Sequence, residues 1–243
     1  MVDTLVWVTG GSAGIGAALI RAVPYDDALV FDISRSGGTA GAQHVAADLS
    51  DPDSWEAVAA HFAAQLDGFA GDRAVLIHNA GTLEPLGFAG EVDSETYRRS
   101  VVLNSGAPQA IGDAFLAALA ASRFGGQAVV VQLSSGAATT PSPGWSTYCA
   151  GKAALQMWVR CVGQEQQRRE SRVTVLAVAP GVVATGMQER IRQTSPHDFP
   201  NVERFQQLHA RDELRDPDAV ARDLWALLDT DVETGAVLDL RSR

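Results

Sequence analysis

Short apolar segments alternate with longer amphipathic segments along most of the chain. The apolar segments are rich in Val, Leu and Ile and almost continuous, which is typical of strands buried on both faces of a parallel sheet. They are Leu5–Val8, Ala28–Ile33, Ala74–Ile77, Ala128–Gln132, Val173–Val178 and Ala236–Leu240. Helical patterns lie between them, over Gly14–Val23, Asp53–Leu66, Ser94–Ser122, Thr147–Glu170 and Pro217–Leu228. This alternation predicts one α/β domain over residues 1–243, with a doubly wound parallel sheet flanked by helices.

One segment interrupts the alternation. Residues 186–215 are polar, contain Pro196 and Pro200, and separate the last two predicted strands. A long excursion near the carboxyl edge of such a sheet is typical of a functional loop. We therefore expect a substrate loop or lid at about residues 186–215.

The amino-acid composition limits the kinds of molecule that the protein is expected to bind. The 243 residues include 19 Lys and Arg against 29 Asp and Glu, which gives a net charge of −10. A dedicated nucleic-acid protein or a protein of anionic membranes would normally present a basic face, so neither partner is expected. A small anionic ligand stays compatible with this charge, because a few local donors suffice to bind a phosphate.

The cysteines and the first residues predict a cytoplasmic protein. Cys149 and Cys161 are twelve positions apart in one predicted helix, too far for a disulfide between them. This pattern is typical of a reducing compartment. The chain starts without the basic segment of a signal peptide, and no apolar run approaches the ~18 residues of a membrane span.

A glycine-rich turn follows the first strand. It reads Thr-Gly-Gly-Ser-Ala-Gly-Ile-Gly over residues 9–16 and opens the first predicted helix. Glycines there permit a tight turn and the close approach of a pyrophosphate to a helix N-terminus. The spacing Thr-Gly-x-x-x-Gly-x-Gly resembles the short-chain dehydrogenase/reductase family. The resemblance implies a Rossmann-type fold, with cofactor contacts from Gly10, Ser12, Ala13, Gly14, Ile15 and Gly16.

A second motif supplies candidate chemistry. Tyr148 and Lys152 are four positions apart, so they share one face of a helix. A lysine ammonium one turn away favours the phenolate and is expected to lower the pKa of Tyr148, which makes it a usable acid or base. The family resemblance adds Ser135, in preference to its neighbour Ser134, as the residue that binds the substrate carbonyl. It also implies that Asn104 supports a water in a proton relay.

The resemblance assigns further residues to the cofactor. Asp48 and Leu49, which follow a third strand region, match the adenine contact. The segment Asn79-Ala80-Gly81 matches one that borders the cofactor, and it is preceded by His78 where the family often has Asn; His78 is given no catalytic role. The remaining implied contacts are Tyr148, Lys152, Pro180, Gly181, Val183 and Thr185, the last four around the nicotinamide.

The end of the second strand predicts the cofactor. Counted from Thr9, the acid by which the family selects NAD falls at Ser34, and Arg35 follows it. These two side chains predict a pocket for the 2′-phosphate of NADP(H). Asp32 favours NAD(H) instead if the strand ends two residues earlier. No metal ion is expected.

Within the family, the segments around Tyr148 and Phe205 resemble benzil reductases and, more distantly, sepiapterin reductases. This implies an NADPH-dependent carbonyl reductase that acts on a small-molecule ketone, an α-dicarbonyl or an aromatic ketone. Trp145 and Met187 are then expected in the substrate pocket, although core packing explains Trp145 equally well. Two alternatives stay open: an NAD-dependent alcohol dehydrogenase of the same family, and a catalytically silent NADP-sensing protein. The resemblance also implies a homodimer or homotetramer.

Overall fold

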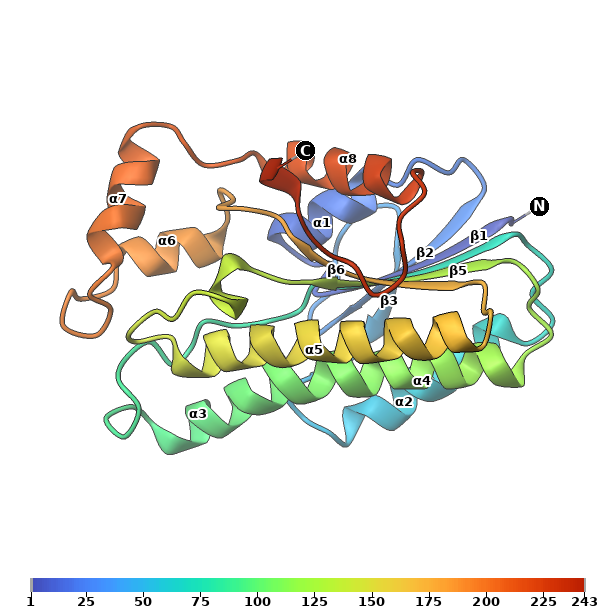
Figure 1. Cartoon of the computed structure of the whole chain (residues 1–243), viewed down its shortest axis with the longest axis horizontal. Coiled ribbons are helices and arrows are strands. Elements are labelled where there is room, and N and C mark those ends of the chain that lie inside the picture. Colours follow the sequence, from blue (N-terminus) through green and yellow to red (C-terminus); the bar gives the residue numbers. More distant parts are fainter. Residues whose placement is uncertain (1, 243) are drawn as a thin grey trace.

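Seven parallel strands form one sheet through the centre of the molecule (Figure 1). The computed structural model describes residues 2–242. The order in the sheet is β3-β2-β1-β4-β5-β6-β7, so the direction of winding reverses between β1 and β4. Such a reversal opens a crevice beyond the carboxyl ends of the strands. The strands are β1 Thr4–Thr9, β2 Ala28–Ser34, β3 Gln43–Ala46, β4 Arg73–His78, β5 Gln127–Leu133, β6 Val173–Ala179 and β7 Val237–Asp239.

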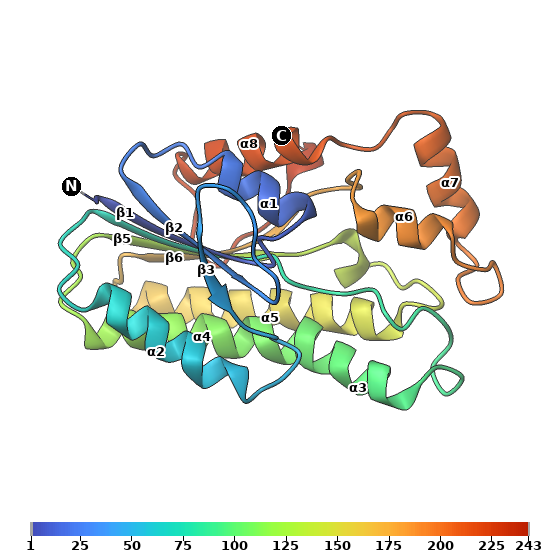
Figure 2. The same cartoon turned by 180° about the vertical axis from the view of Figure 1, so that it is seen from behind.

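Helices cover both faces of the sheet, as Figures 1 and 2 show from opposite sides. One face carries α2 (Ser54–Leu66), α4 (Ala107–Ala121) and α5 (Ser146–Arg168), and the other carries α1 (Gly14–Arg21) and α8 (Pro217–Leu228). The predicted doubly wound Rossmann-type sheet is therefore confirmed. Among the described residues, no helix combines the length and the apolar character needed to cross a membrane.

The core between the sheet and the layer of α2, α4 and α5 is built around an aromatic cluster. Trp7 of β1 is fully buried, and its ring stacks on Phe31 at 5.4 Å between centroids. The edges of Phe62 and Phe115 meet the same ring at 5.4 and 5.5 Å. Trp7 thus joins two strands to α2 and α4, which fixes one helix layer on the sheet.

The prediction of one continuous helix over Ser94–Ser122 is wrong, because the segment is interrupted. The structure divides it into α3 (Ser94–Val101), a π-helical turn (Val102–Gly106) and α4. Pro108 has no N–H to donate to the carbonyl of Asn104, four residues earlier, so regular α-helical bonding is interrupted there. The interruption changes the face on which Asn104 lies, and this side chain is buried.

Three other elements differ from the sequence pattern. Strand β3 lies at the sheet edge and is largely exposed, so it carries little of the apolar signal used for the other strands. Residues 186–215 contain two helices that were not predicted, α6 (Gly186–Arg192) and α7 (Val202–Ala210). Both lie beyond the carboxyl ends of the strands, away from the two helix layers (Figures 1 and 2).

Replacing Trp7 by Ala should lower the free energy of unfolding by about 3–5 kcal/mol, because the change leaves a large cavity among Phe31, Phe62 and Phe115. Urea unfolding followed by circular dichroism measures this loss. Met157, which is 56% exposed on α5, provides the control: its replacement by Ala should change the value by less than about 0.5 kcal/mol. Similar losses in both variants would contradict this description of the core.

Candidate active site

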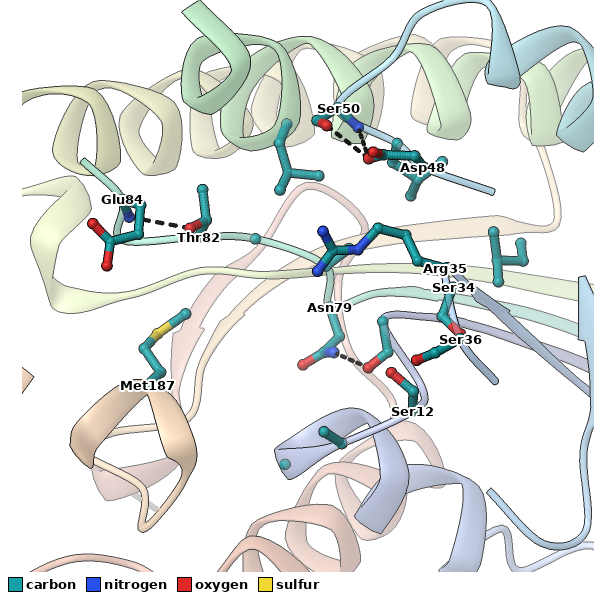
Figure 3. Close-up of a pocket in the computed structure, with 18 of the residues that line it drawn as sticks. Ser12, Ser34, Arg35, Ser36, Asp48, Ser50, Asn79, Thr82, Glu84 and Met187 are labelled. Carbon is teal, nitrogen blue, oxygen red and sulfur yellow. Dashed lines mark hydrogen bonds between the residues drawn. The ribbon is translucent and has the colours of Figure 1, made fainter. Parts of the chain in front are cut away.

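A cavity of about 520 Å³ lies at the carboxyl ends of β1, β2 and β4. Its walls come from the turn after β1, the end of β2, the segment after β3, the end of β4 and the start of α6 (Figure 3). Most of the residues assigned to the cofactor line it. They are Gly10, Ser12, Ala13, Gly14, Ile15, Ser34, Arg35, Asp48, Leu49, Asn79, Ala80, Gly81 and Thr185.

The glycine turn has the backbone shape that a phosphate-bearing cofactor requires. Gly10 and Gly14 have φ of +64° and +54°, a region that residues with a side chain rarely adopt. A Cβ on Gly16 would lie 2.1 Å from the carbonyl oxygen of Gly10, so no larger residue fits there. Helix α1 begins at Gly14 with no side-chain cap and no acidic residue in its first turn. Its first N–H groups are therefore available to an anion, which fits the pyrophosphate of a dinucleotide.

The sequence left open whether Arg35 with Ser34, or Asp32, faces the cofactor at the end of β2. Arg35 is exposed and extends into the cavity, with Asp48 and Ser50 on one side and Ser12 and Ser36 on the other (Figure 3). Ser34 is buried, and its hydroxyl accepts a hydrogen bond from the Gly37 N–H at 3.0 Å.

Asp32 does not line the described cavity. It is only 1% exposed and packs beneath the glycine turn, where a Cβ on Gly11 would lie 2.5 Å from its Oδ1. Strand β2 continues to Ser34, two residues beyond Asp32. The register that would bring Asp32 to the cavity is thus not the observed one.

Asp48 is held from two sides. Its Oδ1 accepts hydrogen bonds from the backbone N–H and the hydroxyl of Ser50, at 3.0 and 2.6 Å. Its Oδ2 pairs with Nη2 of Arg99 at 2.9 Å. Burial raises the pKa of Asp48, but the bonds from Ser50 and the Arg99 charge outweigh burial and lower the pKa overall. Asp48 is therefore a fixed carboxylate in the wall of the cavity.

Asn79 connects the end of β4 to the glycine turn. Its Nδ2 donates to the carbonyl oxygens of Thr9 and Gly10 at 3.0 and 3.1 Å. The Thr9 hydroxyl in turn accepts from the backbone N–H groups of Asn79 and Ala80, both at 3.0 Å. These bonds hold two neighbouring cavity walls in a fixed relation.

Tyr148 and Ser135 lie together at the end of β5. Burial raises the pKa of the Tyr148 phenol, and a hydrogen bond with Ser135 lowers it, with burial the larger effect. The expectation that Lys152 lowers this pKa below its usual value is therefore wrong for the protein as it stands. Ser134 has a different partner, since its hydroxyl accepts from Nε2 of Gln156 at 2.8 Å. Of the two serines, Ser135 is the one that contacts Tyr148.

Lys152 is buried behind the tyrosine. Its Nζ donates to the Leu133 carbonyl at 2.7 Å and lies 5.7 Å from the centroid of the Tyr148 ring. Burial lowers the pKa of Lys152 to about 8. The lysine is thus largely charged at neutral pH but close to its titration, which is the state expected of a group that passes on protons.

Asn104 lies near Lys152. Its Oδ1 accepts from the Thr82 N–H at 2.9 Å, and its Nδ2 donates to the Thr82 carbonyl at 2.8 Å and to the Ser100 hydroxyl at 3.1 Å. A Cβ on Gly81 would lie 3.1 Å from Oδ1 of Asn104 and 3.7 Å from Nζ of Lys152. The π-helical turn therefore brings Asn104 to the lysine.

A second cavity of about 290 Å³ adjoins the first, and the two share Ile15, Thr185 and Met187. Ser135 and Tyr148 line it, and so do Pro180, Gly181 and Val183. Trp145 also lines it, while its ring stacks on Phe199 with centroids 4.5 Å apart. Trp145 is thus a cavity wall and part of the core at once, and Met187 stands where the two cavities meet.

Some residues of the site carry no sequence signal that the pattern analysis detected. Arg99 reaches Asp48 although 51 positions separate them. Likewise, Leu83 comes from the segment after β4, and Asn201 comes from the polar segment in which no helix was expected. Only the folded chain brings these residues to the cavities.

Comparison with known proteins agrees with this geometry. Residues 4–196 match the family model described as short chain dehydrogenase. The chain belongs to the short-chain dehydrogenase/reductase family. It is therefore an oxidoreductase, and the family binds nicotinamide cofactors.

Individual relatives are similar over most of the chain. A benzil reductase ((S)-benzoin forming) of Bacillus subtilis is 34% identical over 237 residues, which cover 96% of this chain and 97% of that protein. A sepiapterin reductase of Rattus norvegicus is 36% identical over 170 residues, which cover 69% of this chain and 63% of that protein. Among solved structures, the KRED1-Pglu enzyme superimposes with a TM-score of 0.81 at 26% identity, over 96% of this chain and 99% of that one.

His78 should make the protein sensitive to mild acid. Burial and the charge of Lys152 lower the pKa of His78 to about 3, against 6.5 in the unfolded chain. Between these values the unfolded chain binds a proton that the native protein does not, so stability falls as the pH falls. From pH 7 to pH 5 the contribution is about 2 kcal/mol.

Urea unfolding of the wild type and of His78→Asn at pH 7 and pH 5 measures this effect. The wild type should lose about 2 kcal/mol more than the variant, because asparagine does not titrate. Equal losses in the two proteins would show that His78 does not carry the acid sensitivity.

Proposed function

We propose that this protein is an NADPH-dependent carbonyl reductase that acts on α-dicarbonyl or aromatic ketones. The observation that carries the proposal is the Ser135–Tyr148 pair, which opens into a cavity walled by Trp145 and continuous with the cavity assigned to the cofactor. The resemblance to benzil reductases supports the substrate class. Met187, which lines both cavities, stands at the boundary where a carbonyl carbon would meet a nicotinamide.

When bound, the cofactor supplies the hydride that reduces the carbonyl carbon. Ser135 donates a hydrogen bond to the carbonyl oxygen and so orients the substrate. Tyr148 gives its phenolic proton to that oxygen as the alcohol forms. Lys152, held by the Leu133 carbonyl, replaces the proton, and Asn104 supports the route from solvent.

The raised pKa of Tyr148 keeps its phenol protonated at neutral pH, and this is the form that donates a proton in a reduction. The complete set of Ser135, Tyr148 and Lys152 argues against a catalytically silent binding protein.

Arg35 supports NADP(H) over NAD(H). It is exposed inside the cavity, next to Ser34 and Ser36, whereas Asp32 is buried beneath the glycine turn. A guanidinium makes strong charge-assisted bonds to a phosphate, so this corner suits a 2′-phosphate.

Residues 186–215, which contain α6 and α7, suit the role of a lid over the cavities. Arg190 of α6 donates from Nε to Oε1 of Glu84 at 2.6 Å, and Glu84 lines the cofactor cavity. This bond links the lid segment to the sheet side of the cleft.

The expected homodimer or homotetramer and the cytoplasmic location stay predictions. Light scattering after gel filtration tests the oligomeric state.

Tyr148→Phe should keep NADPH binding within about twofold and lose at least about 100-fold in kcat, because the phenol is the proton donor. Fluorescence titration with NADPH and initial rates with benzil measure the two quantities. Tyr25→Phe removes a phenol next to Arg73, outside both described cavities, and should leave kcat unchanged. Near-normal turnover in Tyr148→Phe would refute the proposed role.

Arg35→Glu should raise the KM for NADPH by about 10- to 100-fold and change the KM for NADH far less, because a carboxylate repels the 2′-phosphate. Initial rates with each cofactor at saturating ketone measure this. Arg123→Glu makes the same charge change at an exposed position that lines neither described cavity. If Arg35→Glu leaves the cofactor preference as it is, the NADP assignment is wrong.

A further inference from the structure

The charge of the substrate cavity differs from that of the whole protein. The chain carries 29 Asp and Glu and a net charge of −10. Among the described residues that line the cavity of about 290 Å³, however, there is no Asp or Glu, whereas Arg204 and Arg241 both line it. A cavity with cationic and no anionic side chains attracts anions even in an acidic protein.

The two arginines differ in how many of their N–H groups are already bonded to an acidic side chain. Arg241 donates from Nε to Oδ1 of Asp239 at 3.0 Å and from Nη2 to Oδ2 at 2.5 Å. These bonds and the Asp239 charge raise the pKa of Arg241, and the arginine lowers the pKa of Asp239. The charge of Arg241 is therefore largely balanced within the protein.

Arg204 has no acidic partner in the part of the chain that the structure describes. It is exposed on α7, and its Cζ lies 5.9 Å from the centroid of the Phe205 ring, a side chain that also lines the cavity. A guanidinium near an aromatic face makes no hydrogen bond to the ring, so its N–H groups can still bind a ligand. Its hydrogen-bonding capacity is thus available at the cavity.

The position of Arg204 complements that of the catalytic pair. Ser135 follows β5 at the sheet, whereas Arg204 comes from α7, which lies well beyond the strands (Figure 1). Asn201 at the same rim donates from Nδ2 to the Ser142 hydroxyl at 2.9 Å, which adds polar groups beside the arginine. Leu83 and Trp145 add apolar walls to the same cavity. The cavity is therefore lined by a proton donor from the sheet side, by apolar side chains and by a cation from α7.

We propose that the preferred substrates are anionic ketones, with an apolar or aromatic body and a carboxylate that Arg204 binds. Keto acids with an aryl group are of this class. The inference rests on the proposed carbonyl reductase function and adds the charge of the substrate to it.

A matched pair of compounds tests the proposal. 4-Acetylbenzoate and its methyl ester carry the same phenyl ketone and differ in the negative charge, and the ring separates the carboxyl group from the ketone. Arg204→Gln should raise the KM for 4-acetylbenzoate by about 10- to 100-fold, the range for loss of a charged hydrogen bond, and change the value for the ester by less than about twofold. Arg204→Lys, which keeps the charge, should recover part of the loss.

The controls separate this inference from the function on which it rests. Arg211→Gln removes an exposed arginine just after α7 that does not line the described cavity, and should affect neither compound. NADPH titration of each variant shows that it is folded. Equal effects of Arg204→Gln on acid and ester, or no effect on either, would overturn the role of Arg204 while reduction of the ester still supports the carbonyl reductase. No NADPH oxidation with either compound or with benzil would overturn both.

Discussion

The contact between α5 and the carboxyl end of β5 determines where the chemistry can occur. Nζ of Lys152 donates to the Leu133 carbonyl at 2.7 Å, and this buried bond fixes the helix at the point where Tyr148 meets Ser135. One residue earlier, a Cβ on Gly151 would lie 2.6 Å from Cβ of Asn104. The helix therefore approaches the π-helical turn closely because position 151 has no side chain. Tyr148, Lys152 and Asn104 lie in one place as a result of these two contacts.

The electrostatics of the site follow from this burial. Tyr148 has a raised pKa and Lys152 a pKa lowered to about 8, because burial removes water and disfavours the charged form of each group. A protonated phenol beside a lysine near its titration can release a proton and regain it. The net charge of −10 is not concentrated at the cavities: Arg35 and Arg99 accompany Asp48 and Glu84 in the first, and Arg204 and Arg241 line the second, which has no Asp or Glu among its described lining residues. An acidic protein thereby offers local cationic corners to a dinucleotide and to an anionic substrate.

The sequence predicts most of what depends on local pattern. Continuous apolar runs predict the central strands, and the Thr9–Gly16 turn and the Tyr148–Lys152 spacing predict the elements of the site that are close along the chain. What it misses depends on distant contacts. Strand β3 is exposed and has no apolar run, so its bounds were not predicted, although a third strand region before Asp48 was expected. Helices α6 and α7 form in a polar segment that packs against Trp145 and Tyr148 through Phe199 and Phe205. The raised pKa of Tyr148 was not predicted, because burial by the tertiary structure outweighs its neighbours in the helix.

The proposed reduction of a ketone with a nicotinamide cofactor is tested most directly by mixing the purified protein with NADPH and benzil, following the loss of reduced cofactor, and identifying the product by chromatography. We expect benzil-dependent oxidation of NADPH with formation of benzoin in equal amount, and a much slower reaction with NADH. Saturable binding of NADPH without oxidation, across benzil and a panel of other diketones, would contradict it.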